Sequence, residues 1–323
     1  MHGSGAIAFP GLGIGEFFVD RVAFTVFGRE VYWYGVFIAT AFLLGVLLSL
    51  RLARENGLDQ DHIVNLVLIT TPVSIVGARA YYVLTTLDRY DSFYDMIAIW
   101  EGGIAIYGAI LAGMVCFFVY CRAKKLPFLK VLDVAAPSVI LGQGIGRWGN
   151  FVNQEAFGRV TDLPWRMELT INGVRQAVHP TFLYESLWDV AGCALLLWIF
   201  FHRRADGQTA FSYFVWYGVG RFFIEGLRTD SLYVGPFRIS QLVSIALCAV
   251  GVVMLRRILR RPAAGAAGEA QPGEAGCVPA PGQSAADAPA PGDEPGEAAA
   301  DAPAPGDEPG EAAACGPQEG QRP

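Results

Sequence analysis

Seven apolar stretches dominate this chain between Trp33 and Met254, and they constrain its fold more than any other feature. Each has roughly the length of about 20 residues that a helix needs to cross the hydrocarbon core of a bilayer. They run approximately over residues 33–50, 62–84, 100–120, 131–150, 187–201, 210–226 and 239–254. With 53% hydrophobic and 17% charged residues, the chain is also too apolar for a soluble protein of 323 residues. The sequence therefore predicts an all-α polytopic membrane protein with seven transmembrane helices and an extracytoplasmic loop region.

Residues 262–323 differ from the rest of the chain in composition. They contain 11 acidic residues and one arginine, a net charge of −10, whereas residues 1–261 carry a net charge of +4. The run ADAPAPGDEPGEAA occurs from Ala286 and again from Ala300, a 14-residue repeat without a hydrophobic face. Such a segment cannot bury enough apolar surface to offset its ordering entropy. We expect a membrane domain over residues 1–261 and a disordered acidic cytoplasmic tail over residues 262–323.

Basic residues in the predicted loops indicate which side of the membrane each loop occupies. One set of loops carries twelve Lys and Arg in short segments, and the opposite set carries eight arginines, three of them in one long loop. Because short cytoplasmic loops are enriched in Lys and Arg, we expect the N-terminus outside the cell and the C-terminus in the cytoplasm. The twelve are Arg51, Arg54, Arg122, Lys124, Lys125, Lys130, Arg203, Arg204, Arg256, Arg257, Arg260 and Arg261.

Three arginines lie inside the apolar stretches, where a charge persists only if it is paired, faces a cavity or does chemistry. At a rise of about 1.5 Å per residue, Arg79 and Arg147 lie about 25 Å from the cytoplasmic side and Arg221 about 18 Å. All three are therefore predicted in the outer half of the membrane. Tyr34, Glu101 and Tyr107 fall at a similar depth.

The spacing of the charged residues indicates an anion site. Arg221 and Glu225 are four residues apart, so on a helix they share one face and can pair. This pair is interpreted either as a purely structural ion pair or as an arginine held ready to meet an anion. The run GRWGNFVNQEAFG (146–158) adds Arg147, Asn150 one turn further on, and Glu155. Since guanidinium groups bind phosphate oxygens in a bidentate manner, a phospholipid phosphate is the ligand that these residues indicate.

Other features are less specific. Arg79, in GARAYY, is interpreted as another phosphate contact or as an arginine that extends toward the interface. His179, in HPTFLYES, is interpreted as a loop or capping histidine or as a base. The six cysteines show no pairing pattern and no CxxC, so neither disulfides nor a metal site is predicted. No cofactor or nucleic-acid motif is present, so nucleic acid is not an expected partner.

The run GRWGNFVNQEAFG resembles the signature of prolipoprotein diacylglyceryl transferase, the bacterial enzyme that begins lipoprotein maturation. Gly-Arg, Gly-Asn-Phe, Asn, Glu and the final Gly stand at the matching positions within residues 146–158. The segments YWYG (32–35), GAR (77–79), WEGG (100–103), HPTFLYE (179–185) and GRFFIEGLR (220–228) also resemble family segments, in the family's order. The resemblance covers about residues 15–260 and leaves out the tail.

The resemblance implies a multi-pass transferase of the bacterial cytoplasmic (inner) membrane. It would move the sn-1,2-diacylglyceryl group of phosphatidylglycerol to the lipobox cysteine of a preprolipoprotein, forming a thioether and releasing glycerol phosphate. Its partners would be phosphatidylglycerol, the lipobox segment and membrane lipids. By matching position, Arg147 and Arg221 would hold the phosphate and Glu225 would orient Arg221. The headgroup pocket would be shaped and lined by Asn150, Glu155, Gly158 and Tyr34.

One position departs from the family pattern. The best-known members carry a histidine after the paired glycines, proposed as the base, where this chain has Tyr107. With a reference pKa of about 10, tyrosine is a poor resting base. Either the base role is not obligatory, or Glu101, Glu225 or His179 serves, or the arginines lower the pKa of the substrate thiol.

Two other classes of function stay open at this stage. A lipid or anion transporter would also place arginines in a membrane cavity, but transporters commonly show inverted repeats with broken helices. We find no internal repeat across the two halves of residues 1–261. A scaffold that acts through its acidic tail would leave the buried charges unexplained.

Overall fold

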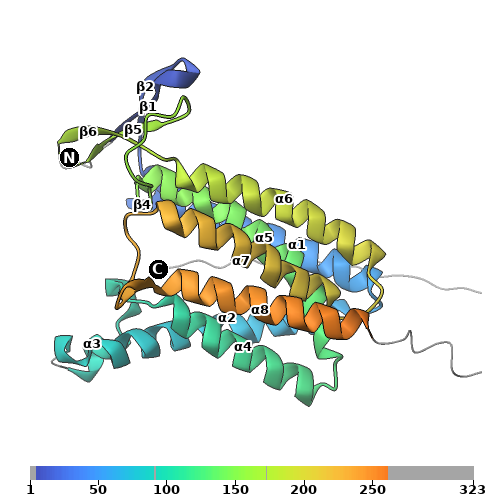
Figure 1. Cartoon of the computed structure of the whole chain (residues 1–323). Helices are drawn as coiled ribbons and strands as arrows, with labels where there is room; N and C mark the ends of the chain where they lie inside the picture. Colours follow the sequence, from blue (N-terminus) through green and yellow to red (C-terminus); the bar gives the residue numbers. More distant parts are fainter. Residues whose placement is uncertain (1–4, 91, 172, 261–323) are drawn as a thin grey trace, which may run out of the picture. The chain divides into compact units, whose positions relative to one another are not determined.

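The computed structural model describes residues 5–90, 92–171 and 173–260, and the predicted acidic tail lies outside these residues. Seven long helices in the described part form one bundle (Figure 1). They are α1 (Trp33–Glu55), α2 (Gln60–Thr85), α4 (Ile106–Ala123), α5 (Phe128–Asn153), α6 (Thr181–His202), α7 (Gln208–Leu227) and α8 (Ile239–Leu259). The shorter helical segments are η1 (Pro10–Leu12), η2 (Leu87–Arg89), α3 (Phe93–Ile97) and η3 (Ile99–Glu101).

Six of the long helices are long and apolar enough to cross a membrane, namely α1, α2, α4, α5, α6 and α8. The chain is thus mostly helical, as expected for a polytopic membrane protein. Large apolar side chains cover the outside of the bundle; Leu68, Val115 and Leu187 are each more than 60% exposed. The helix α7 is similar in length but is not among the six, because polar and charged residues such as Arg221 and Glu225 interrupt its apolar sequence.

The prediction of an all-α fold is wrong at one end of the bundle, where the connecting segments form β-structure. The strands β1 (Gly5–Phe9), β2 (Ile14–Val19), β5 (Met167–Ile171) and β6 (Val174–Val178) form an antiparallel sheet in the order β2-β1-β5-β6. Alternate side chains, including Ile7, Phe9, Met167 and Leu169, form its buried core. Alternation over such short strands is a weak signal beside long apolar stretches. We call this end of the bundle, which carries the sheet in Figure 1, the sheet end.

Two hairpins complete the sheet end. The first pairs β3 (Val22–Val26) with β4 (Arg29–Tyr32), and β4 leads directly into α1. Its two turn residues, Phe27 and Gly28, both have positive φ, as a two-residue hairpin turn of this kind requires. The second pairs β7 (Tyr233–Val234) with β8 (Phe237–Arg238) and leads into α8.

The helix of the third apolar stretch begins later than residue 100, the predicted start. Gly102 and Gly103 have φ values of 89° and 79°, a left-handed conformation that ends a helix, so η3 ends at Glu101 and α4 starts at Ile106. The side chain of Glu101 lies outside the described part of the structure. The fifth stretch differs in the opposite sense, since α6 begins at Thr181 rather than at residue 187.

A pair of tryptophans fixes α6 to α7. The rings of Trp188 and Trp216 stack with centroids 4.3 Å apart and an interplanar angle of 19°. Each indole N–H donates to the main-chain carbonyl of the other tryptophan, at 3.1 and 3.0 Å. A Cβ at Gly192 or Gly220 would collide with one of the indoles, so both glycines are needed for the rings to fit. This arrangement sets the register of α6 against α7.

At the opposite end of the bundle, a buried carboxylate of α5 caps the first turn of α7. Asp133 is fully buried and accepts hydrogen bonds from the main-chain N–H groups of Gly207 and Ala210, at 2.7 and 2.8 Å. Arg203 lies 3.5 Å from the same carboxylate. The helices α5, α6 and α7 are therefore held together by polar contacts at this end as well as by tryptophans nearer the sheet end.

Candidate functional site

Three arginines surround one buried glutamate at the sheet end of α5, α6 and α7. Glu185, in the second turn of α6, is 5% exposed. Its carboxylate pairs with Arg147 of α5, Nε to Oε2 at 2.6 Å, and with Nη1 of Arg221 from α7. Arg228, which follows α7, lies 3.9 Å from the same carboxylate. We call Arg147, Arg221, Arg228 and Glu185 the arginine cluster.

The predicted helix-face pair is present and adds a second carboxylate to the site. Arg221 Nη2 lies 2.6 Å from Glu225 Oε2, one turn further along α7. Glu225 is 1% exposed, and its main-chain carbonyl accepts a hydrogen bond from Arg238. Arg221 is therefore held between two buried carboxylates, which fixes its guanidinium in one place.

The polar residues of the run 146–158 form a group just beyond Arg147. After α5 ends, Gln154 and Ala156 adopt positive φ values of 55° and 57°, and the chain turns back toward the helix. Glu155 Oε1 then accepts hydrogen bonds from the side-chain amides of Asn150 at 2.9 Å and Asn153 at 3.3 Å. The structure thus brings Asn150 and Glu155 together at the end of the helix that carries Arg147.

Two glycines of the same run are needed for close packing. An added Cβ at Gly149 would collide with the ring of Tyr34, so Tyr34 of α1 packs directly against α5 at this position. Gly158 donates its N–H to the carbonyl of His179 at 3.0 Å and forms a β-bridge with Arg228. The loop after α5 is therefore joined to the beginning of α6 and to the end of α7.

Arg79 lies in a different part of the bundle, where it binds main-chain carbonyls. It is 7% exposed, and its guanidinium donates to the carbonyls of Asp95, Met96, Gly102 and Gly103. It therefore fixes the segment between α2 and α4. Tyr107, in the first turn of α4, is partly buried, and no hydrogen bond within the described residues joins it to the arginine cluster.

Two acidic residues of α6 were missed by the sequence reasoning. Glu185 and Asp189 are four residues apart and share one face of the helix, and Asp189 is also buried, close enough to interact with Arg147 and Arg221. The signal was present, because two carboxylates with i,i+4 spacing in an apolar helix indicate a polar site. The predicted helix began at residue 187, which left Glu185 in the loop.

Two titratable groups of the loops at the sheet end have shifted pKa values. Burial lowers the pKa of His179, whose Nδ1 lies 3.3 Å from the hydroxyl oxygen of Tyr184. Burial alone would raise the pKa of Asp230, but hydrogen bonds from Arg228 at 2.8 and 3.0 Å and its charge lower it overall. Neutral His179 and ionised Asp230 are therefore favoured near neutral pH.

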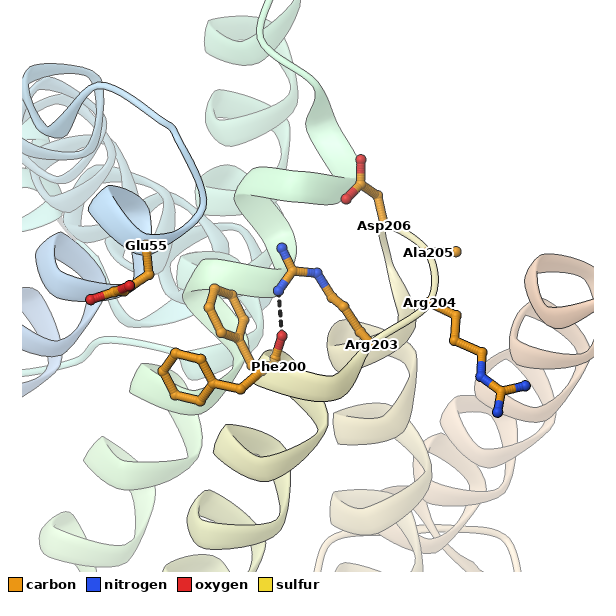
Figure 2. Close-up of a pocket in the computed structure, with 7 residues that line it drawn as sticks. Glu55, Phe200, Arg203, Arg204, Ala205 and Asp206 are labelled. Carbon is orange, nitrogen blue, oxygen red and sulfur yellow. Dashed lines mark hydrogen bonds between the residues drawn. The ribbon is translucent and has the colours of Figure 1, made fainter. Parts of the chain in front are cut away.

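A pocket lies at the opposite end of the bundle, and Figure 2 shows the residues that line it. It has a volume of about 330 Å³ and is lined by Glu55, Phe200, Phe201, Arg203, Arg204, Ala205 and Asp206. The guanidinium of Arg203 is engaged in structural contacts, since it donates to the carbonyl of Phe200 and to the side chain of Asn56. We therefore interpret this pocket as a structural feature of the loop between α6 and α7.

A second cavity lies between α1, α2, α4 and α5 and is lined mainly by apolar side chains. Its volume is about 420 Å³. Ile38, Phe42 and Leu66 are among its lining residues, and Gly142 lies at its α5 wall. The hydroxyls of Ser49 and Ser138 on its lining bond each other at 2.8 Å. This chemistry suits a hydrocarbon chain rather than a polar ligand.

The arginine cluster has the chemistry of an anion site. Guanidinium groups in a low dielectric bind phosphate oxygens strongly, and fixed donors stabilise negative charge that develops during a reaction. Within residues 5–90, 92–171 and 173–260, no group of three or more His, Cys, Asp or Glu side chains is arranged to hold a metal ion.

Comparison with known proteins shows a family match over most of the described chain. Residues 21–257 match the model of the family described as prolipoprotein diacylglyceryl transferase. A phosphatidylglycerol–prolipoprotein diacylglyceryl transferase of Finegoldia magna is 48% identical over 238 residues, which cover 73% of this chain and 94% of that protein. Proteins of the same name from Clostridium perfringens (transferase 1) and Pediococcus pentosaceus are 45% and 42% identical, covering 75% and 74% of this chain and 96% and 91% of their own lengths.

Proposed function

The chain belongs to the prolipoprotein diacylglyceryl transferase family, and on this premise we propose that the arginine cluster is the site of diacylglyceryl transfer. The protein is a transferase that moves the diacylglyceryl group of phosphatidylglycerol to a prolipoprotein cysteine. The observation that carries the site assignment is the convergence of Arg147, Arg221 and Arg228 on Glu185. No observation favours the transporter alternative.

The free edge of Arg147 supports phosphate binding at this cluster. Glu185 engages Arg147 through Nε, and within the described residues Nη1 and Nη2 of Arg147 make no hydrogen bond. The Arg147 side chain is 21% exposed, so part of it is open to a ligand. A phosphate diester would bind Nη1 and Nη2 of Arg147 in a bidentate manner, with Arg221 and Arg228 supplying further positive charge.

The chemistry of the transfer places negative charge where the arginines lie. The cysteine sulfur forms a bond to the glyceryl carbon, and the bond between that carbon and the phosphate oxygen breaks. The electron pair of the broken bond stays on the phosphate, which leaves as glycerol phosphate, and the thiol proton is lost. Fixed guanidinium groups lower the free energy of this charged transition state.

The proton acceptor is a separate part of the proposal. Of the groups considered, Glu225 is already engaged in an ion pair with Arg221 at 2.6 Å, so its carboxylate has a structural partner. His179 lies in the loop before α6, and burial lowers its pKa, so it is neutral and able to accept a proton. If His179 is the base, Tyr107→Phe retains transfer activity and His179→Gln loses it; the reverse result assigns the role to Tyr107.

The residues around the arginine cluster indicate where the rest of the phospholipid would lie. Asn150, Glu155, Gly158 and Tyr34 lie around the sheet end of α5 and would shape the glycerol headgroup pocket. Arg79 would contribute by fixing the α2–α4 segment, with a direct phosphate contact as the alternative. The apolar cavity between α1, α2, α4 and α5 would hold one acyl chain.

We also propose an orientation of the bundle in the membrane. The basic residues at the end opposite the sheet support a cytoplasmic location for that end, with α7 as a seventh crossing helix and the N-terminus outside. The arginine cluster would then lie in the outer leaflet of the bacterial cytoplasmic membrane. Protease added outside spheroplasts is expected to cut the β5–β6 turn and to spare the loop between α6 and α7; the opposite pattern contradicts this orientation.

The test of the site is a transfer assay with purified protein, phosphatidylglycerol and a lipobox peptide, read by mass spectrometry. The wild type is expected to add a diacylglyceryl mass to the cysteine, and Arg147→Gln to lose it. Arg175→Gln is the matched control, because Arg175 is 52% exposed and pairs with Glu16 and Glu168 in the sheet. Full activity of Arg147→Gln would remove the arginine cluster from the reaction.

A further inference from the structure

We propose that Glu185 is a positioning residue for this reaction, one that fixes Arg147 and Arg221 relative to each other and leaves the outer edge of Arg147 free for phosphate. The inference rests on the proposed function of the arginine cluster. It assigns a role to a carboxylate that the sequence reasoning left without one.

Glu185 is the bridge between two helices. Its Oε2 pairs with Arg147 of α5 at 2.6 Å, and its Oε1 pairs with Arg221 of α7. Among the described residues, no other carboxylate pairs with both arginines, since Glu225 pairs with Arg221 alone. One carboxylate therefore sets the distance between the two guanidinium groups.

Glu185 is itself fixed by its neighbours on α6. Ser186, the next residue, accepts a hydrogen bond from the indole of Trp148 on α5 at 3.1 Å. Trp188, three residues on, stacks against Trp216 of α7. The helix that carries Glu185 is thus held to both helices that carry its arginines, and the buried carboxylate has little freedom to move.

The electrostatics explain why the reaction needs this residue. Two neighbouring guanidinium groups repel each other, and the repulsion is strong in a low dielectric. The other charged groups near the pair are Glu225, Asp189, Arg228 and Asp230. Asp189 interacts electrostatically with both arginines, but among the described residues only Glu185 forms a close ion pair with both. Without Glu185, Arg147 and Arg221 would keep their charges but lose their fixed spacing.

Glu185→Gln is expected to have a specific kinetic signature. The site becomes more positive, so binding of the anionic lipid is not weakened, and KM for phosphatidylglycerol stays the same or falls. The arginines are no longer preorganised for the transition state, so kcat falls by about 100-fold. Glu168→Gln is the matched control, because Glu168 pairs with Arg166 and Arg175 in the sheet and is expected to leave both constants unchanged.

A double-mutant cycle separates positioning from a general structural role. If Glu185 acts through Arg147, then in an Arg147→Ala background the Glu185→Gln change lowers the residual rate by less than about twofold. Glu185→Asp, which keeps the charge on a shorter side chain, is expected to restore part of kcat and provides a second variant if Glu185→Gln folds poorly. All rates are measured per folded enzyme after size-exclusion chromatography.

The inference is overturned if both Glu185 variants keep a kcat close to that of the wild type, or if the effects of Glu185→Gln and Arg147→Ala multiply. A rise in KM with unchanged kcat would also overturn it. These results differ from failure of the proposed function, in which Arg147→Ala itself would retain full transfer activity.

Discussion

The substitution Gly158→Ala tests whether close packing behind the arginine cluster matters for the reaction. An added Cβ would lie 2.6 Å from Cβ of His179, 3.0 Å from Cγ2 of Thr181 and 3.2 Å from the carbonyl oxygen of Leu227. These atoms belong to main chain or short side chains on three segments, so none can rotate away. The methyl group would have to push the loop after α5 away from α6 and from the end of α7.

The magnitude follows from the cost of overpacking, which is about 1–3 kcal/mol for an extra methyl group in a tight site. If this strain acts fully on the transition state, the rate falls by about 5-fold to about 150-fold. Part of it would appear as lower stability, with a melting temperature reduced by about 2–4 °C per kcal/mol. The effect reaches the site because Gly158 is bridged to Arg228, which lies 3.9 Å from Glu185.

The assay for this substitution is diacylglyceryl transfer to a lipobox peptide at saturating phosphatidylglycerol, together with a thermal melt. The matched control is Gly15→Ala, because a Cβ at Gly15 has no atom within 4 Å and its φ is not in the left-handed region. We expect the control to match the wild type in both measurements. If Gly158→Ala also matched the wild type, the packing argument would be wrong.

Four further substitutions or conditions test other parts of the structure. In Asp133→Asn the side chain can accept hydrogen bonds through one oxygen only, so we expect the free energy of unfolding to fall by about 1–3 kcal/mol with unchanged activity per folded enzyme. An unchanged melting temperature would contradict the capping role of Asp133. Because burial lowers the pKa of His179, the unfolded state binds more protons, and stability should fall as pH drops below about 6.5; His179→Gln should flatten this slope. Gly142→Leu extends into the apolar cavity and should slow transfer from long-chain phosphatidylglycerol more than from short-chain lipid, whereas an equal effect on both would argue against an acyl-chain site. Deletion of residues 262–323 should leave transfer activity intact in the same assay, whereas a protein acting as a scaffold through its tail would lose its role; loss of transfer activity would show that the reaction needs the tail.

The parts of the fold that local sequence patterns determine were predictable. Apolar stretches of membrane-spanning length located the long helices, and the spacing of Arg221 and Glu225 indicated an ion pair that the structure contains. Helix boundaries were less accurate, because a boundary depends on a few residues, such as the positive-φ pair Gly102 and Gly103. The late predicted start of α6 is the reason why Glu185 was missed.

Contacts between distant segments could not be predicted from one sequence. Nothing in the sequence near Asp133 indicates that it accepts from Gly207 and Ala210, which follow only after the whole of α6. The sheet could not be predicted for the same reason, because β1 lies near the N-terminus and pairs with β5, which comes after α5. A single sequence supplies residue types and local spacing, and long-range pairing depends on packing that many sequences can satisfy.

The stacked tryptophans have a consequence for how this chain can change over evolutionary time. Trp188 fills the space that Gly220 leaves open, and Trp216 fills the space at Gly192. A larger residue at either glycine is compatible only with a smaller residue at the facing tryptophan, so these four positions should be inherited as one unit. Homologous chains are therefore expected to show paired changes at them, while substitutions elsewhere on the outer faces of α6 and α7 accumulate independently.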